Sequence, residues 1–132
     1  MATWDEVHRI AMALPEAEER SPRDWRVKGK GFVCERPLRK ADLLELGADA
    51  PSGPVLGARV ADPGVKEALL ADAPDVYFTT SHFDGYAMVL VRLDEIGSAE
   101  LEELVVESWL VRAPKRLAKQ YLDATGRPPA AT

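Results

Sequence analysis

The segment YFTTSHFDGYAMVLVRLDEIGSAELEELVVESWLVRAPKRL, residues Tyr77–Leu117, decides the fold. Within it, Tyr86–Leu93 is apolar on both faces of an extended chain, which predicts a strand in the middle of a sheet. From Ser98 to Arg112 apolar residues recur at helical spacing beside a row of glutamates, and this pattern predicts a long helix packed on that sheet. A proline then breaks the helix. A last helix is predicted over Pro114–Ala124.

A hairpin is predicted upstream of this segment. Asp24–Lys28 alternates polar and apolar residues, as a half-buried strand does, and Phe32–Arg36 follows as the return strand. Gly29-Lys30-Gly31 between them is a tight connection that tolerates positive φ.

The N-terminal region predicts a helix with a defined start. Thr3 and Glu6 form a capping box, in which the Thr3 hydroxyl accepts from the Glu6 N–H and the Glu6 carboxylate reaches back. The other expected elements are a helix over Trp4–Ala13, a polar loop over 15–23, a helical turn over Ala41–Leu46, strands over Val55–Ala61 and Val76–Thr80, and a short helix from Asp62-Pro63 to Asp72.

This order of elements predicts an α+β fold. We expect a single compact domain with a mostly antiparallel sheet of about five strands, and with the N-terminal helix and the C-terminal helices packed on it. The length of 132 residues fits one domain, expected over residues 1–125, followed by a disordered tail over 126–132.

Composition restricts the class of protein further. The chain is 46% hydrophobic and 30% charged, which are values of a globular domain. Its one cysteine, Cys34, allows no internal disulfide and fits a reducing compartment. There is no apolar run long enough to span a bilayer, and the N-terminus has no signal-peptide pattern. We therefore expect a cytoplasmic protein without a membrane partner.

Charge is distributed unevenly along the chain. The formal net charge is −5, yet residues 20–40 hold eight Lys or Arg against two acids, and residues 112–127 hold five against one. The rest of the chain is therefore strongly acidic. Because local patches decide contact with phosphate, the two basic segments matter more than the overall sum.

Four short motifs in order give the chain a family resemblance. They are Leu14-Pro15-Glu16 after the first helix, the hairpin Trp25–Val33, Leu93-Asp94-Glu95 after the central strand, and the segment from Glu107-Ser108-Trp109 to Leu117. This pattern resembles the MmcQ/YjbR family over nearly the whole chain, although Trp109 and Tyr86 stand where that family often has Tyr and Trp. The resemblance implies a CyaY-like α+β fold and a double-wing, DNA-binding arrangement of hairpins. It implies no established catalytic residues.

The basic segments make double-stranded DNA the most concrete candidate partner. Cations at the hairpin tip and on the last helix would contact phosphates, and about six such contacts would make binding steeply dependent on salt. The same cations would also keep an exposed hairpin soluble, and that alternative stays open. The candidate DNA-binding residues are Arg26, Lys28, Lys30, Lys115, Arg116 and Lys119.

The alternative is a protein-interaction or small-ligand-binding module. His82, Asp84 and Tyr86 form the most polar cluster of the chain, and a pocket holding all three would favour this function. The sequence holds no zinc-binding pattern, phosphate loop or nucleophile motif, so we expect no metal, no cofactor and no enzymatic activity. Cys34 is expected to be a half-buried, inert thiol.

Overall fold

The computed structural model describes residues 2–126 of the chain. Its six strands form one antiparallel sheet in the order β1-β2-β3-β4-β6-β5. The elements are α1 (Trp4–Met12), β1 (Ala17–Ser21), β2 (Asp24–Val27), β3 (Lys30–Glu35), α2 (Lys40–Leu46), β4 (Val55–Arg59), α3 (Pro63–Asp72), β5 (Tyr77–Phe78), β6 (Met88–Arg92), α4 (Ser98–Arg112) and α5 (Lys115–Thr125), with 3₁₀ turns over Gly47–Asp49, Ser81–Phe83 and Leu93–Glu95.

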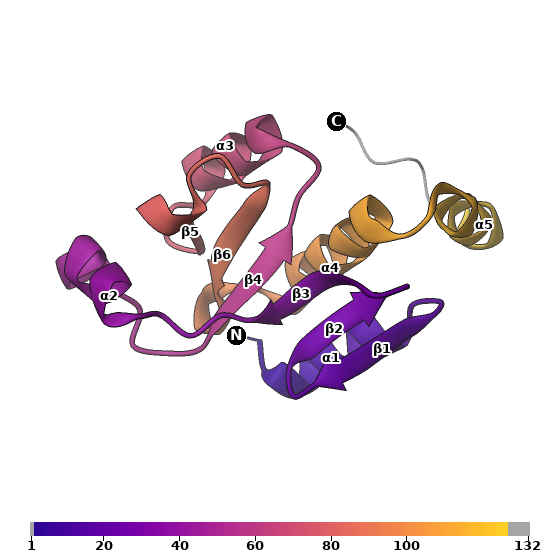
Figure 1. Cartoon of the computed structure of the whole chain (residues 1–132), viewed down its shortest axis with the longest axis horizontal. Coiled ribbons are helices and arrows are strands. Elements are labelled where there is room, and N and C mark those ends of the chain that lie inside the picture. The colour runs from indigo at the N-terminus through magenta and orange to yellow at the C-terminus, as the bar shows by residue number, and fades with distance from the viewer. Residues whose placement is uncertain (1, 127–132) are drawn as a thin grey trace.

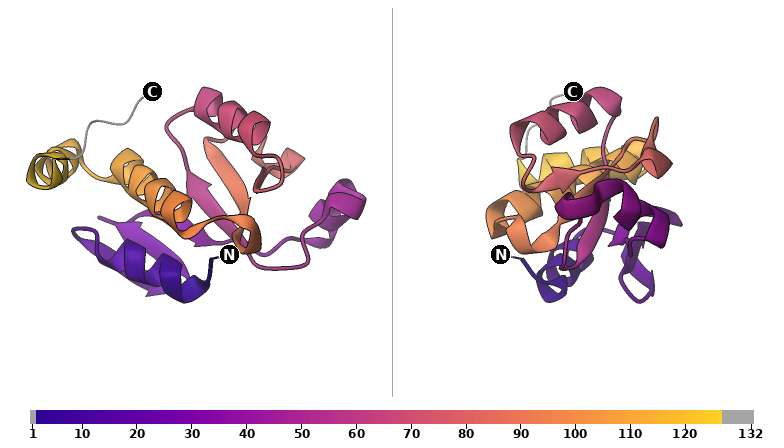
Figure 2. Two further views of the ribbon diagram at one scale, coloured as in Figure 1. Left: turned by 180° about the vertical axis from the view of Figure 1, so that it is seen from behind. Right: turned by 90° about the vertical axis from the view of Figure 1, so that its left-hand side faces the viewer.

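The two faces of the sheet differ in what covers them. Helices α1 and α4 lie across one face, which Figure 2 shows from the helix side. Figure 1 looks onto the opposite face, where no helix of the described chain lies over β2, β3 and β4. We call this second side the open face. Helix α3 packs against β5 and β6, α2 lies at one end of the molecule, and α5 lies at the other (Figure 1).

The covered face holds the main core. Strand register aligns Trp25 with Val33, Val33 with Ala58, and Ala58 with Val89, so one row of apolar side chains crosses four strands. All four are at most 1% exposed, and Trp109 of α4 is fully buried in the same cluster. Burial of this row against α1 and α4 is the main stabilising term for such a sheet.

The predicted fold class is confirmed: the chain forms one α+β domain with an antiparallel sheet, an N-terminal helix and C-terminal helices. Strand β6 is flanked on both sides, by β4 and β5, as its apolar sequence predicted. The sheet has six strands, one more than about five. Of the predicted tail over 126–132, residues 127–132 lie outside the described residues.

The prediction of a loop over residues 15–23 was wrong. Ala17–Ser21 is an edge strand, β1, paired with β2. Four of its five residues are exposed, so it lacks the polar–apolar alternation that reveals a half-buried strand. It is held to the sheet through backbone hydrogen bonds, and its charged side chains suit an exposed edge.

The capping box at α1 forms only in part. The Thr3 hydroxyl accepts a hydrogen bond of 3.2 Å from the Glu6 N–H, as predicted. The Glu6 carboxylate instead accepts a hydrogen bond of 2.7 Å from the Ser98 hydroxyl. Glu6 therefore connects the first turns of α1 and α4.

Candidate nucleic-acid interface

Two adjoining hollows lie on the open face. The first, of about 250 Å³, is the tyrosine pocket, and its lining includes Arg36, His82 and Tyr86. The second, of about 310 Å³, is the hairpin pocket, and its lining includes Lys30 and Arg112. Both pockets share Cys34, Arg59 and Met88 as lining residues, so they form one continuous depression along β3 and β4.

Four cations in this depression form no salt bridge within the described part of the chain. Lys30 begins β3, Arg36 follows its end, Arg59 ends β4 and Arg112 ends α4. The guanidinium of Arg36 instead lies over the ring of Phe83, 4.9 Å from its centroid, and Arg112 Nε donates to the Gly31 carbonyl oxygen at 3.1 Å.

The charges of Arg59 and Arg112 act on one another. Burial, and after it the positive charge of Arg59, lowers the pKa of the Arg112 guanidinium from its usual value. Two like charges held close repel each other, and the one carboxylate that lines the hairpin pocket, that of Asp24, is paired with Arg26 at 3.0 Å. A bound anion would relieve that repulsion, so the arrangement favours an anionic ligand.

A buried lysine holds the loop that carries His82 and Tyr86. Lys66 of α3 is only 7% exposed, and its Nζ donates to the carbonyl oxygens of Phe83, at 2.8 Å, and Tyr86, at 3.2 Å. Burial lowers the pKa of Lys66, while the charge of Asp84 opposes this shift.

The far end of the same loop is fixed by α2. The Glu45 carboxylate accepts from the Ser81 N–H, at 3.0 Å, and from the Ser81 hydroxyl, at 2.7 Å. The loop therefore presents Tyr86, which is 55% exposed, from a backbone anchored on both sides.

The structure separates the predicted DNA-binding residues into two groups. Three are neutralised by acids: Arg26 by Asp24, Lys28 by Glu16 and Lys119 by Asp123, with N···O distances of 3.0, 2.9 and 2.8 Å. The other three are free of salt bridges within residues 2–126, and they are Lys30, Lys115 and Arg116.

The tip of the β2–β3 hairpin and the last helix lie at one end of the molecule. Figures 1 and 2 both place α5 beside the connection between β2 and β3. The hydrogen bond from Arg112 to Gly31 joins the end of α4, three residues before α5 begins, to the start of β3. The hairpin and the last helix can therefore face the same partner.

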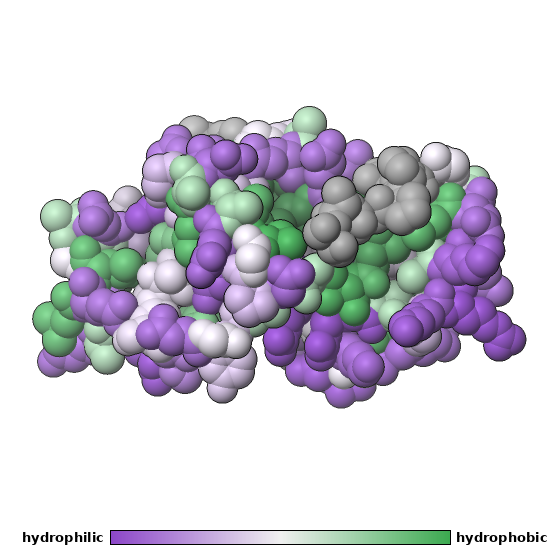
Figure 3. All heavy atoms as spheres, turned by 90° about the horizontal axis from the view of Figure 1, so that it is seen from above, coloured by the Kyte–Doolittle hydropathy of each residue, from purple (hydrophilic) through white to green (hydrophobic). Residues whose placement is uncertain are grey.

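Opposite ends of the molecule differ in surface character. Figure 3 shows hydrophilic side chains along the outer edge of the α5 end, and hydrophobic side chains mixed with hydrophilic ones at the α2 end. Leu43 and Leu44 of α2 are 44% and 75% exposed.

The predicted cluster of His82, Asp84 and Tyr86 is only partly assembled. His82 and Tyr86 both line the tyrosine pocket, whereas Asp84 is not among its lining residues. The three residues thus do not share one pocket, because Asp84 and Gly85 turn the chain between the two that do. The imidazole of His82 packs edge-on against Phe83, with ring centroids 5.0 Å apart.

Cys34 lies between the two pockets but is not activated. Burial, followed by the negative charge of Asp24, raises the pKa of its thiol, against the opposing charges of Arg36, Arg59 and Arg26. The thiol is therefore protonated at neutral pH and a poor nucleophile.

Sequence reasoning missed Arg36, Arg59 and Arg112 as site residues, and Lys66 as the residue that positions the loop. The one available signal was the alternation of side chains along a strand. Arg59 lies two residues from Gly57, so these two residues lie on the same face of β4. Nothing in the sequence shows that this face remains open.

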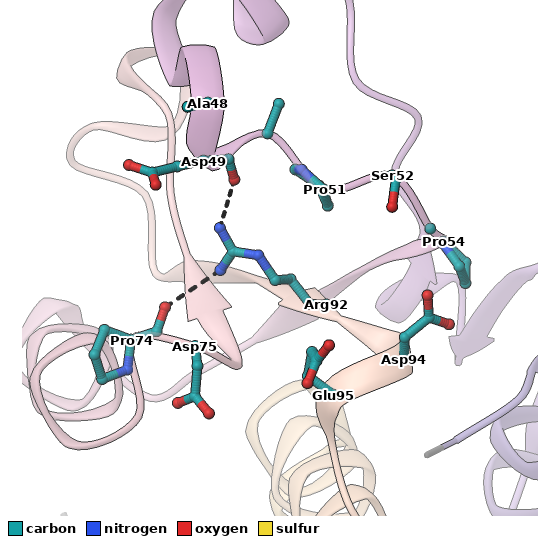
Figure 4. A pocket seen from close by; sticks show the side chains of 12 residues that line it. Ala48, Asp49, Pro51, Ser52, Pro54, Pro74, Asp75, Arg92, Asp94 and Glu95 are labelled. Carbon is teal, nitrogen blue, oxygen red and sulfur yellow. Dashed lines mark hydrogen bonds between the residues drawn. The ribbon is translucent and has the colours of Figure 1, made fainter.

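Another hollow, of about 480 Å³, lies beside β6 (Figure 4). Its arginine, Arg92, donates to the carbonyl oxygens of Asp49, at 2.8 Å, and Pro74, at 3.3 Å, and its guanidinium lies over Phe78. Figure 4 also shows carboxylates around this hollow, which belong to Asp49, Asp75, Asp94 and Glu95. Arg92 thus fixes the local backbone, and the acidic lining disfavours an anionic ligand.

Residues 2–126 include no candidate membrane span and no candidate metal site. No helix in that range has the length and apolar character needed to cross a bilayer. No group of three or more His, Cys, Asp or Glu side chains in that range could hold a metal ion.

The fold and the site together define an α+β domain with one helix-covered face and one basic open face. The chain belongs to the YjbR family, whose family model matches residues 12–111. This confirms the resemblance found in the sequence.

Relatives and a solved structure agree with this assignment. Uncharacterized proteins of Mycobacterium tuberculosis and Mycobacterium bovis are each 55% identical over 129 residues, covering 96% of this chain and all of each relative. The crystal structure of a Deinococcus radiodurans protein with a DUF419 domain matches with a TM-score of 0.65 at 21% identity, covering 99% of this chain and 93% of that one. At that identity the likeness establishes the fold alone.

Proposed function

We propose that this YjbR-family protein binds DNA and catalyses no reaction. The observation that carries the proposal is the depression on the open face, where Lys30, Arg36, Arg59 and Arg112 form no salt bridge among the described residues. Lys115 and Arg116 at the start of α5 extend this positive region at the same end of the molecule (Figure 1). These six cations form what we call the basic surface.

The charge balance predicts modest affinity and strong salt dependence. Each phosphate neutralised by a Lys or Arg releases condensed counterions, with a slope of roughly −0.9 per contact in log affinity against log salt. Four to six contacts would lower affinity about 10²- to 10³-fold between roughly 50 and 200 mM salt. The acidic remainder of the chain confines DNA to the basic surface. DNA as the partner would also place the protein in the cytoplasm.

The test is fluorescence anisotropy with a short labelled DNA duplex at those two salt concentrations. The double variant Lys30→Ala/Arg116→Ala should weaken binding and flatten the salt slope by about two contacts, roughly 1.8. Lys40→Ala is the matched control, because this exposed lysine lies on α2 at the opposite end. No binding at the lower salt concentration, or equal losses in both variants, would refute the proposal.

Small-ligand binding is the second candidate function. It is supported by the tyrosine pocket, which brings His82 and Tyr86 together beside two arginines. Pyrophosphate is a suitable anionic probe, because a ligand that binds only the folded state raises the midpoint of thermal unfolding. If this function holds, pyrophosphate should stabilise the wild type and not Arg36→Met/Arg59→Met, whereas equal midpoints with and without pyrophosphate would count against it.

A further inference from the structure

We infer that the tyrosine pocket receives one unstacked nucleotide of a single-stranded segment, with its base against Tyr86 and its phosphate against Arg36 and Arg59. This inference rests on the proposed DNA binding and specifies which form of DNA the open face selects. In this inference the base is recognised by Tyr86, which is not one of the six cations of the basic surface.

The size of the pocket supports a single nucleotide. At about 250 Å³, opening into the hairpin pocket of about 310 Å³, the depression is close to the lower range of small-ligand sites. A duplex is far too wide to enter it and would contact only its rim. An unpaired base can be splayed out of the strand and inserted, as in single-strand recognition generally.

The lining has the chemistry that an unstacked nucleotide requires. Seven residues line the tyrosine pocket, and none of them carries a carboxylate. They are Arg36, Arg59, His82, Tyr86, Phe83, Met88 and Cys34. Arginines bind phosphate through several N–H donors, and aromatic faces stack on bases. The stacking of Arg36 on Phe83 orients its guanidinium while leaving donors for a phosphate.

Tyr86 offers an exposed aromatic ring. Its side chain is 55% exposed, and its hydroxyl has no hydrogen-bond partner among residues 2–126. Its ring lies at 74° to that of Phe83, with centroids 6.5 Å apart. Meanwhile its carbonyl oxygen is held by the buried Lys66. An exposed ring on an anchored backbone can stack on a base without ordering a flexible loop first.

The adjoining hairpin pocket gives the rest of the strand a path. Lys30 and Arg112 line it, and Arg59 lies between the two pockets. A strand with one base in the tyrosine pocket would therefore pass its neighbouring phosphates toward the β2–β3 connection and α5. The strand would therefore run along the basic surface.

The experiment compares labelled oligothymidine of about 12 nucleotides with a duplex of the same length, at low salt. We expect the single strand to bind the wild type more tightly. Tyr86→Ala should weaken single-strand binding about 5- to 100-fold, the loss expected for one stacked base, while duplex binding changes less than about twofold. Tyr86→Phe should bind like the wild type, because the ring rather than the hydroxyl is used.

The outcomes separate this inference from the proposed function. If the duplex binds in a manner that depends on Lys30 but Tyr86→Ala leaves single-strand binding unchanged, the inference is overturned and DNA binding stands. If neither DNA form binds, both fail. If Tyr86→Phe loses as much as Tyr86→Ala, stacking is not the interaction and the inference is also overturned. Circular dichroism of each variant establishes that it is folded.

Discussion

The ammonium of Lys66 donates a hydrogen bond of 2.8 Å to the main-chain oxygen of Phe83, seventeen residues away. A second hydrogen bond, of 3.2 Å, reaches the oxygen of Tyr86. One buried cation of α3 thus fixes the backbone of the loop that carries both His82 and Tyr86. The geometry of the tyrosine pocket depends on a residue that does not line it.

Replacing Lys66 by methionine should therefore destabilise the fold. The substitution keeps the aliphatic stem but leaves the Tyr86 carbonyl oxygen without its donor, while the Phe83 oxygen keeps the Tyr86 N–H at 3.0 Å. The expected cost is about 1–3 kcal/mol. Denaturant unfolding followed by circular dichroism measures this loss. Lys40→Met, on an exposed position of α2, is the matched control and should change the stability by less than about 0.5 kcal/mol. Equal midpoints for both variants would show that the Lys66 hydrogen bonds contribute nothing.

Tyr77 should make the stability depend on pH above about 10. Its hydroxyl donates to the Glu100 carboxylate at 2.5 Å, and burial, followed by Glu100, raises the pKa of the phenol. Because the folded-state pKa lies above the unfolded value of about 10, this stabilisation is complete below pH 10. It is lost as the pH rises from there toward the folded-state pKa.

Tyr77→Phe tests that dependence. At neutral pH the variant should be less stable by about 1 kcal/mol, the contribution of one hydrogen bond. Between pH 9.5 and about 10.5 the wild type should lose more stability than the variant, because only the wild type carries the shifted phenol. Parallel losses in the two proteins, measured by denaturant unfolding, would contradict the assignment. Tyr121→Phe, on the half-buried face of α5, is a control for removing a phenol.

Ser108 should tolerate neither deletion nor enlargement of its side chain. It is fully buried, and its hydroxyl donates to the Arg59 carbonyl oxygen at 2.7 Å. Ser108→Ala should cost about 1 kcal/mol through the lost hydrogen bond. Ser108→Leu should cost about 1–3 kcal/mol or more, because added methylenes would force α4 away from β4. Ser52→Ala, at an exposed position, is the control, and a neutral Ser108→Leu would rule out close packing here.

Sequence patterns predicted those elements in which side chains themselves carry the signal. The apolar strand β6 and the helix α4 were predicted because burial on both faces, or along one stripe, constrains nearly every residue. Strand β1 was not, because its backbone is held by β2 while four of its five side chains face solvent. A polar edge strand and a polar loop have the same composition.

The candidate site could be predicted only in part, for a geometric reason. The basic hairpin and α5 were visible as local charge runs, but the acids that neutralise them were not all local. Glu16, which pairs with Lys28, precedes β1, so its proximity depends on a strand the sequence did not reveal. Arg36, Arg59 and Arg112 come from three separate elements, and only the strand register and the end of α4 bring them together.

Arg59 should increase DNA affinity at the expense of stability. Burial, and after it the charge of Arg59, lowers the pKa of Arg112, and neither guanidinium forms a salt bridge with a carboxylate among residues 2–126. Arg59→Met keeps most of the aliphatic packing and removes the repulsion, so the free protein should become more stable by roughly 0.5 kcal/mol at low salt. The gain should shrink as salt rises, because screening weakens the repulsion in the wild type.

The same variant should bind DNA more weakly. Loss of one phosphate contact should lower the salt slope by about 0.9. Thermal unfolding and anisotropy on one preparation measure both effects, and residues that serve binding often reduce stability in this way. Arg9→Met, an exposed cation on α1 behind the sheet, is the control and should change neither quantity appreciably. A variant at Arg59 that loses stability and keeps its DNA affinity would show that Arg59 is a structural residue. Arg59, the central cation of the depression on the open face, would then not be a DNA-binding residue.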